Sequence, residues 1–121
     1  MDKARVAIFE DHEMVADSLT RGLEWMGHSA VATAKTLGEA EQLIANLAED
    51  GLDLAIVDGN LTRGDISGRD GANITRLLKG KFSGIVVIGM SGNNEVEGAD
   101  HQIIKGQGND LQAIESIIAK L

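Results

Sequence analysis

The sequence contains no cysteine and no proline among its 121 residues, and it has no long apolar run. Without cysteine the chain can form neither a disulfide framework nor a thiolate zinc site, and it has no cysteine nucleophile. A membrane span needs about 18 apolar residues in a row, and the charged start at residues 1–9 lacks the apolar stretch of a signal peptide. We therefore expect a soluble, cytoplasmic protein that does not bind membranes.

A basic surplus is also missing, because the formal net charge is −8 at pH 7. Residues 1–60 hold four basic and twelve acidic residues, whereas residues 61–121 hold seven of each. The whole acidic excess therefore lies in the first half of the chain. Such a balance argues against direct nucleic-acid binding and favours cations or basic partners.

The length suits one domain over residues 1–121, since domains cluster near about 100 to 150 residues. Short apolar runs rich in β-branched residues predict strands, and apolar residues at helical spacing predict helices between them. The strands are expected at 6–9, 30–34, 54–57, 85–88 and 102–104. The helices are expected near 15–26, 36–51, 74–80 and 109–121, with Thr36 and Asn109 as N-caps and with Gly51 and Gly80 as ends.

Strands that alternate with helices predict an α/β fold with a parallel sheet. We expect a flavodoxin-like, doubly wound, five-stranded sheet in the order 2-1-3-4-5, with helices on both faces. In that order the first and third strands are neighbours, and ligands bind beyond their carboxyl ends. The residues that follow these strands are therefore the candidates for function.

Three acidic residues follow the first and third predicted strands. Glu10 and Asp11 come after the first strand, and Asp58 follows the third, 47 positions beyond Asp11. Two like charges about 5 Å apart repel by roughly 3 kcal/mol at an effective dielectric constant near 20, so the group should either raise its pKa values or bind a cation. Because these ligands offer only oxygen, they favour Mg²⁺ or Mn²⁺ over zinc.

Two further polar residues leave the fourth and fifth predicted strands at the same edge. Ser91 supplies a hydroxyl and Lys105 supplies a compact ammonium group. Both groups suit the oxygens of a phosphoryl group carried by a metal-bound carboxylate. The set predicts phosphoryl transfer to an aspartate, in which catalysis consists mostly of positioning and charge neutralisation.

Five short motifs in this order, on these elements, are typical of one protein family. They occupy residues 9–12, 56–61, 90–92, 98–100 and 104–105. The chain resembles the receiver domain of two-component response regulators over essentially its whole length. The resemblance implies a phosphorelay protein that takes a phosphoryl group from a histidine kinase or a histidine phosphotransfer protein and then changes conformation. Such a receiver catalyses its own phosphorylation and dephosphorylation and is not a multiple-turnover enzyme.

The resemblance also implies roles for single residues. Asp58 is the phosphoacceptor, and Asp11, Asp58 and the backbone carbonyl of Asn60 are the Mg²⁺ ligands, with Glu10 acting through water. The remaining two polar residues bind the phosphoryl group: Lys105 pairs with it, and Ser91 moves its hydroxyl onto it as the switch.

The sequence departs from the family pattern in four places. Only thirteen residues separate Ser91 from Lys105, so we expect the fourth helix to be reduced or absent. At the second switch position Gln102 replaces the usual aromatic residue, which excludes the usual aromatic coupling. Gly106 replaces a proline that the family commonly joins in cis. The loop after Asp58 is lengthened, because residues 62–70 precede the next helix.

Two other functions remain open from the sequence. A receiver-like adaptor that binds partners without phosphorylation is favoured by the missing helix and by Gln102. An aspartate-nucleophile phosphatase is less well supported, because that class needs a second aspartate as general acid where this chain has Asn60. Outside the site, His28 is expected at the surface and Trp25 in or beside the core.

Overall fold

The computed structural model describes residues 1–62, 67–92, 95–106 and 108–121. Its elements alternate between strand and helix along most of the chain. They are β1 (Arg5–Phe9), α1 (Glu13–Trp25), β2 (Ser29–Ala34), α2 (Leu37–Asn46), β3 (Leu54–Asp58), α3 (Arg69–Lys81), β4 (Val86–Ser91), β5 (His101–Ile104) and α4 (Asp110–Ala119).

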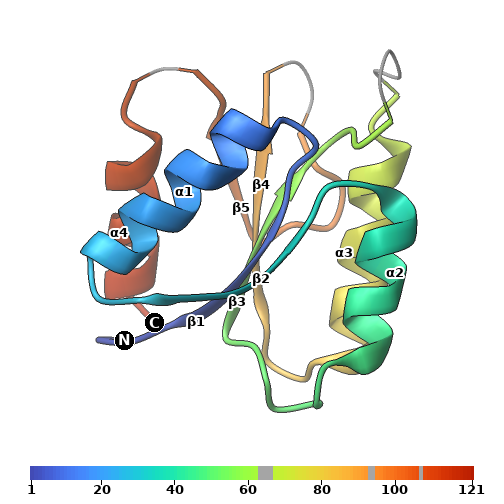
Figure 1. Ribbon diagram of the computed structural model, residues 1–121, viewed down its shortest axis with the longest axis horizontal. Coiled ribbons are helices and arrows are strands. Elements are labelled where there is room, and N and C mark those ends of the chain that lie inside the picture. The colour runs from blue at the N-terminus through green and yellow to red at the C-terminus, as the bar shows by residue number, and fades with distance from the viewer. Residues whose placement is uncertain (63–66, 93–94, 107) are drawn as a thin grey trace.

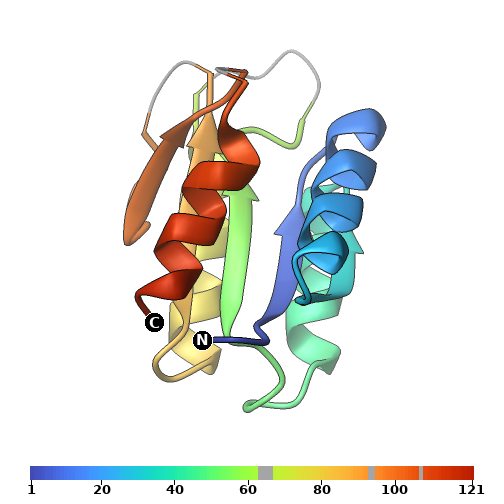
Figure 2. The same cartoon turned by 90° about the vertical axis from the view of Figure 1, so that its left-hand side faces the viewer.

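The five strands form one parallel sheet in the order β2-β1-β3-β4-β5, which confirms the predicted fold class. Helices α1 and α4 cover one face of this sheet, and α2 and α3 cover the other (Figures 1 and 2). The central strand β3 is buried along its whole length, because both of its faces carry a hydrophobic core. None of the helices in the described ranges is long and apolar enough to cross a membrane.

Two predicted helix ends differ from the structure, and the Lys81 side chain links the two helices near these ends. Helix α2 ends at Asn46 rather than Gly51, and α3 continues past Gly80 to Lys81. The Lys81 ammonium donates a hydrogen bond to the carbonyl oxygen of Ile44 at 2.5 Å, in the last turn of α2. A cation at a helix C-terminus satisfies carbonyl groups that lack partners within the helix. The two helices therefore end together through a tertiary contact.

The connection between β4 and β5 contains no helix in its described residues, 92 and 95–100, as the sequence predicted. We call residues 95–100 the strap. At the end of the strap, the backbone N–H of Asp100 donates to the Val87 carbonyl, and the Asp100 carboxylate accepts from the Val87 N–H, both at 2.8 Å. Lys79 of α3 donates to the same carboxylate at 2.7 Å. The strap is thus fixed to the sheet and to α3.

Two residues lie where the sequence did not lead us to expect them. His28 is buried, and both of its ring nitrogens have partners. Its Nδ1 accepts a hydrogen bond from the Ala4 N–H at 3.0 Å, and its Nε2 lies 3.0 Å from Glu115 Oε2. Since Nδ1 accepts, the proton is on Nε2 and is donated to Glu115. Trp25 ends α1 with 91% of its surface exposed, so it does not pack in the core.

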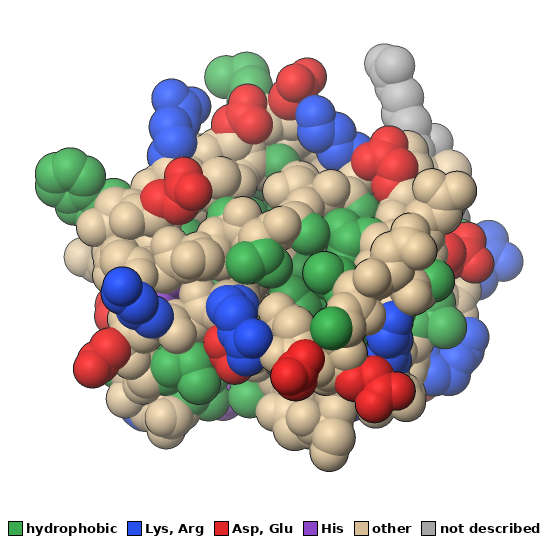
Figure 3. Space-filling view, turned by 60° about the horizontal axis from the view of Figure 1, so that its bottom comes forward, with side chains coloured by type: hydrophobic (Ala, Val, Ile, Leu, Met, Phe, Trp, Pro, Cys, Tyr) green, Lys and Arg blue, Asp and Glu red, His purple; other side chains and the backbone are tan. Residues whose placement is uncertain are grey.

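The amino-terminal end of the sheet lies at the bottom of Figure 1, and Figure 3 brings it forward. Acidic and basic side chains are interspersed over this surface, with hydrophobic atoms between them. One such pair joins the guanidinium group of Arg5 to the carboxylate of Asp53 by two hydrogen bonds of 3.1 Å. The functional candidates lie at the opposite end.

Candidate functional site

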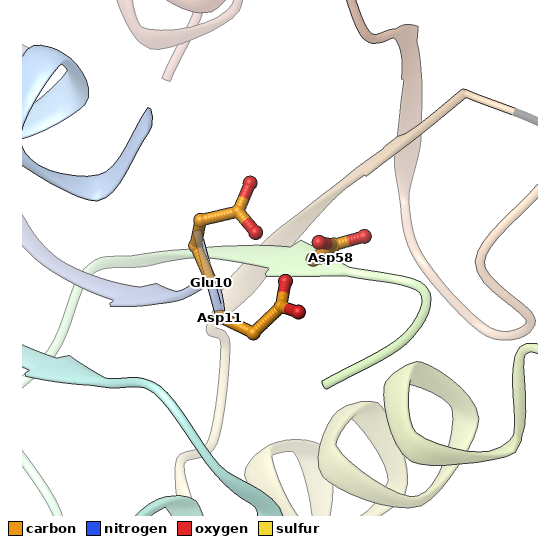
Figure 4. A group of neighbouring side chains, drawn as sticks. All are labelled: Glu10, Asp11 and Asp58. Atoms are coloured by element: carbon orange, nitrogen blue, oxygen red, sulfur yellow. The ribbon is translucent and has the colours of Figure 1, made fainter. Parts of the chain in front are cut away.

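Three carboxylates meet at the carboxyl ends of β1 and β3. These strands are neighbours with Phe9 opposite Val57, so Glu10 and Asp11, which follow Phe9, lie beside Asp58, the last residue of β3. One carboxylate oxygen from each acid lies within 4.8 Å of the other two (Figure 4). The sheet order therefore brings together the acids that the sequence placed 47 positions apart.

Glu10 is the most buried of the three acids, with 3% of its surface exposed. Its Oε2 accepts a hydrogen bond from the His12 N–H at 3.2 Å, at the start of α1. Burial and the neighbouring carboxyl group of Asp58 raise the pKa of Glu10 to about 8. The cluster therefore resists carrying its full negative charge, as expected of like charges in a poorly solvated place.

Lys105 provides the positive charge of the cluster. Its ammonium forms an ion pair with Glu10 and lies 3.0 Å from Asp58 Oδ2. Burial alone would lower the pKa of Lys105, but these two carboxylates outweigh burial and raise it. No cis peptide bond occurs in the described ranges, and Gly106 adopts a φ of 86°. Lys105 is thus held in place by its two carboxylate partners.

The turn that follows Asp58 packs tightly against α3. We call residues 58–60 the acceptor turn. The Gly71 N–H donates to the Gly59 carbonyl at 2.9 Å, and a Cβ atom at Gly71 would lie 2.8 Å from the Asp58 carbonyl oxygen. The Asn60 side chain points away from the acids, since its Oδ1 accepts from the Gly68 N–H at 2.8 Å. Asn60 therefore contributes to the site through its backbone, whose N–H donates to Asp58 Oδ1 at 3.4 Å.

Asp70 is a residue that the sequence interpretation missed. It is buried in the first turn of α3, and its Oδ2 accepts hydrogen bonds from the Leu61 N–H at 3.0 Å and from the Thr62 hydroxyl at 2.9 Å. It fixes the start of the lengthened loop, whose residues 63–66 lie outside the described part. The sequence signal available for Asp70 was an acidic residue in the first turn of a helix that follows a loop with backbone N–H donors.

Ser91 and Gln102 lie on the neighbouring strands β4 and β5, and Ser91 lies beside the acceptor turn. Ser91 ends β4, and a Cβ atom at Gly59 would lie 3.4 Å from its hydroxyl oxygen. Gln102 lies opposite Gly89 in the pairing of β4 with β5. Its amide group forms two hydrogen bonds with the backbone of Val96 in the strap. The predicted site residues thus lie at one end of the sheet, but Gln102 binds the strap rather than the acids.

The donor set fits a small, hard cation. Three carboxylate oxygens lie within reach of one another, and these acids supply neither nitrogen nor sulfur. Burial and the Asp58 carboxyl group raise the pKa of Glu10 despite the opposing effect of Lys105. A divalent cation with oxygen ligands, such as Mg²⁺, would relieve the remaining repulsion.

The family comparison and the fold comparison agree. The family model of the response regulator receiver domain matches residues 6–111. A CheY-like response regulator receiver domain protein from Methanospirillum hungatei is 26% identical, with a TM-score of 0.75 over 97% of this chain and 92% of that one. A CheY-like receiver domain from Methylobacillus flagellatus is 22% identical, with a TM-score of 0.75 over 97% of both chains.

A third similar structure is a response regulator from Burkholderia pseudomallei, crystallised with a phosphorylated aspartic acid, a calcium ion and citrate. It is 22% identical, with a TM-score of 0.69 over 95% of this chain and 74% of that chain. Because the structures from Methylobacillus flagellatus and Burkholderia pseudomallei are each only 22% identical to this chain, they support the fold alone. A search of curated proteins found no match.

Proposed function

Because the chain belongs to the response regulator receiver domain family, we propose that it is a phosphoacceptor receiver of a two-component phosphorelay. The observation that carries the proposal is the convergence of Glu10, Asp11 and Asp58 with Lys105 at one end of the sheet. An acid cluster that contains the buried Glu10 and one lysine costs folding free energy, which is expected where a charged ligand or reaction intermediate must be bound.

In the proposed reaction, a carboxylate oxygen of Asp58 attacks the phosphorus of a phosphohistidine. The new O–P bond forms as the N–P bond to the donor imidazole breaks, and that imidazole keeps the electron pair. Lys105, which already lies 3.0 Å from Asp58 Oδ2, balances charge on the phosphoryl oxygens. The hydroxyl of Ser91, at the end of β4, donates a hydrogen bond to another of these oxygens.

A magnesium ion, or manganese in its place, fits the remaining groups. Asp11, Asp58 and the backbone carbonyl of Asn60 would hold it, and Glu10 would act through a bound water. When bound, the ion supplies neutralisation of negative charge on the transferring phosphoryl group. The calcium ion and phosphorylated aspartic acid of the relative from Burkholderia pseudomallei support this assignment by analogy.

The phosphoryl donor in this proposal is a histidine kinase or a histidine phosphotransfer protein. Ser91 and Gln102 form the switch, with Gln102 acting on the strap in place of an aromatic side chain. The downstream effector would have to recognise a surface that lacks the helix usually found between β4 and β5 in this family. The described residues of that connection, 92 and 95–100, contain no helix.

A second candidate is an adaptor that binds partners without phosphorylation. Its support is the pairing of Lys105 with Glu10 and Asp58, which balances part of the site's charge in the absence of a phosphoryl group. The phosphatase alternative has less support, because the Asn60 side chain is bound to the lengthened loop and cannot serve as an acid.

The test is incubation with acetyl phosphate, with and without Mg²⁺, followed by intact mass and peptide mapping. We expect the wild-type protein to gain one phosphoryl group at Asp58 only when Mg²⁺ is present. Asp58→Asn should gain none, and Asp53→Asn, at the other end of the sheet, should behave as wild type. A wild-type protein that stays unmodified would favour the adaptor, whereas rapid turnover of a small phosphoester would favour the phosphatase.

A further inference from the structure

We propose that Val96, held by the Gln102 side chain, is a positioning residue for the acceptor turn and thereby for phosphoryl transfer to Asp58. This inference rests on the proposed function. It assigns a positioning task to one side chain of the strap, which connects β4 to β5 without a helix in its described residues.

The Gln102 amide binds Val96 as a neighbouring strand would. The Val96 N–H donates to Gln102 Oε1 at 3.0 Å, and Gln102 Nε2 donates to the Val96 carbonyl at 2.8 Å. Both backbone groups of one residue are therefore satisfied by one side chain, as in a β-sheet ladder. The strap is fixed at two points, Val96 and Asp100, and Val96 is the point nearer to the acceptor turn.

The Val96 side chain lies in a space that Gly89 leaves open, near Gly59. Val96 is 1% exposed and packs in the core on the α2 and α3 face. A Cβ atom at Gly89 would lie 2.6 Å from the Val96 Cβ and 2.7 Å from Gln102 Oε1, closer than packed atoms allow. A Cβ atom at Gly59 would lie 3.9 Å from Val96 Cγ2. The absence of a side chain at Gly89 thus lets Val96 pack against β4, and Gly59 lies within ordinary packing distance of the same side chain.

The acceptor turn is held from two sides. On one side Gly71 of α3 contacts its backbone and donates to the Gly59 carbonyl. On the other side Val96 and the Ser91 hydroxyl border the same glycine, Gly59. Because protein interiors are close-packed, removing a side chain from one side of this turn lets the backbone shift or fluctuate.

A shift of this turn would affect the chemistry directly. Gly59 joins Asp58, the proposed phosphoacceptor, to Asn60, whose carbonyl is a proposed metal ligand. Phosphoryl transfer depends on positioning, and a misplacement of about 1 Å can cost about a hundredfold in rate. Val96 touches neither the phosphoryl group nor the metal in this account. It acts through the backbone of Gly59.

The test compares Val96→Ala with Val6→Ala. Both variants remove the same atoms from a buried valine, but Val6 lies at the amino end of β1, far from the carboxyl ends of the strands. We expect Val96→Ala to slow Asp58 phosphorylation by acetyl phosphate by roughly tenfold, since a displacement smaller than 1 Å already reduces positioning. Val6→Ala should lower stability to a similar extent and leave the rate unchanged.

Two further measurements separate positioning from general loosening. Hydrogen exchange of the Gly71 N–H, which donates to Gly59, should accelerate in Val96→Ala beyond its rate in Val6→Ala, without any metal or phosphate. The affinity for Mg²⁺, followed by the amide shifts of residues 58–60, should fall in Val96→Ala alone. Val96→Ile, which keeps the branched side chain, should restore most of the rate.

Gln102→Leu gives a second variant that is expected to fold, because Gln102 is exposed and leucine is of similar size. It should slow phosphorylation as Val96→Ala does, and the double variant should be little slower than either, since the two residues act as one unit. If the wild-type protein is phosphorylated at Asp58, but Val96→Ala and Gln102→Leu are phosphorylated as fast as Val6→Ala, this inference alone is overturned. If the wild-type protein is never phosphorylated at Asp58, the proposed function is overturned as well.

Discussion

Acidic side chains at the two ends of the sheet lie in opposite environments. At the amino end, Asp53 accepts hydrogen bonds from the backbone and the guanidinium group of Arg5, and this partner lowers the pKa of Asp53. At the carboxyl end, burial and Asp58 raise the pKa of Glu10 to about 8. One acid is stabilised in its charged form by the fold, and the other is destabilised in that form.

The difference separates structural charges from functional ones. Asp53 and Arg5 form a complementary pair, and buried His28 has a partner for each ring nitrogen. The carboxyl end gathers three acids around a single lysine among its described residues. Groups that weaken the folded state are expected at sites that bind a ligand, so the contrast supports a division in which one end stabilises the fold and the other binds.

The largest effect on stability is expected from His28→Ala. The substitution leaves the buried Ala4 N–H without its acceptor and removes the bond to Glu115, so we expect a loss of about 2 to 4 kcal/mol in the free energy of unfolding. Urea denaturation measures it. His28→Asn, whose Oδ1 can replace Nδ1 as acceptor, should lose less. A slower phosphorylation of Asp58 in either variant would break the division between the two ends.

Mg²⁺ should stabilise the carboxyl end. Binding to the folded state at about 100 times the dissociation constant adds about 2.7 kcal/mol, and relief of carboxylate repulsion is part of that binding. We expect thermal unfolding to shift upwards with Mg²⁺ in the wild-type protein and in Asp53→Asn. The shift should be largely lost in Asp11→Asn. An unchanged melting temperature at millimolar Mg²⁺ would contradict the metal assignment.

Glu10→Gln should change how stability depends on pH. The pKa of Glu10 in the folded protein is about 8, above its ordinary value of 4.5, so the folded state binds the proton more tightly than the unfolded state does. Its favourable contribution is therefore present below about pH 4.5 and is lost as the pH rises towards about 8.

The measurement is urea denaturation at a series of pH values without divalent metal. The wild-type protein should lose stability relative to Glu10→Gln across this window, and saturating Mg²⁺ should reduce the loss. Each unit of pKa difference corresponds to about 1.4 kcal/mol at most. Parallel curves for the two proteins would show that Glu10 is not strained in its charged form.

The smallest effect is expected from Asp53→Asn. The pKa of Asp53 is lowered, so the stability from its carboxylate is present above pH 3.8 and is lost as the pH falls through the lowered pKa. Because Arg5 is exposed, we expect the melting temperature at pH 7 to fall by only a few degrees, and by less at high salt. A loss as large as that of His28→Ala would contradict the view that this pair is a solvent-screened surface contact.

The strands were predictable because their signal is local. Continuous apolar runs such as 54–57 suit only a strand covered on both faces, and the order of strands and helices then limits the sheet to few topologies. Glu10, Asp11, Asp58, Ser91 and Lys105 could be named for the same reason, since each lies within three residues of the carboxyl end of a predicted strand. Their proximity followed from the sheet order alone.

The misplaced residues depend on partners far away in the chain. His28 is buried between two hydrogen-bond partners that lie 24 and 87 positions away in the sequence. Helix α2 ends early with its last turn bonded to Lys81, which lies 37 positions beyond Ile44. Trp25 is exposed even though the nearby Leu23 and the adjacent Met26 are apolar. No local pattern contains such information, because it depends on which surfaces the fold brings into contact.

The amino-acid sequence by itself determined the α/β class, the strand order and the set of polar residues at the carboxyl ends, because hydrophobic periodicity and chain direction act over short distances. Only the tertiary structure decided the charge balance of the acid cluster, the burial of His28 and the close packing of Val96 against Gly89. Each of these depends on distances between segments remote in sequence, and the strength of electrostatic and packing forces is set by those distances.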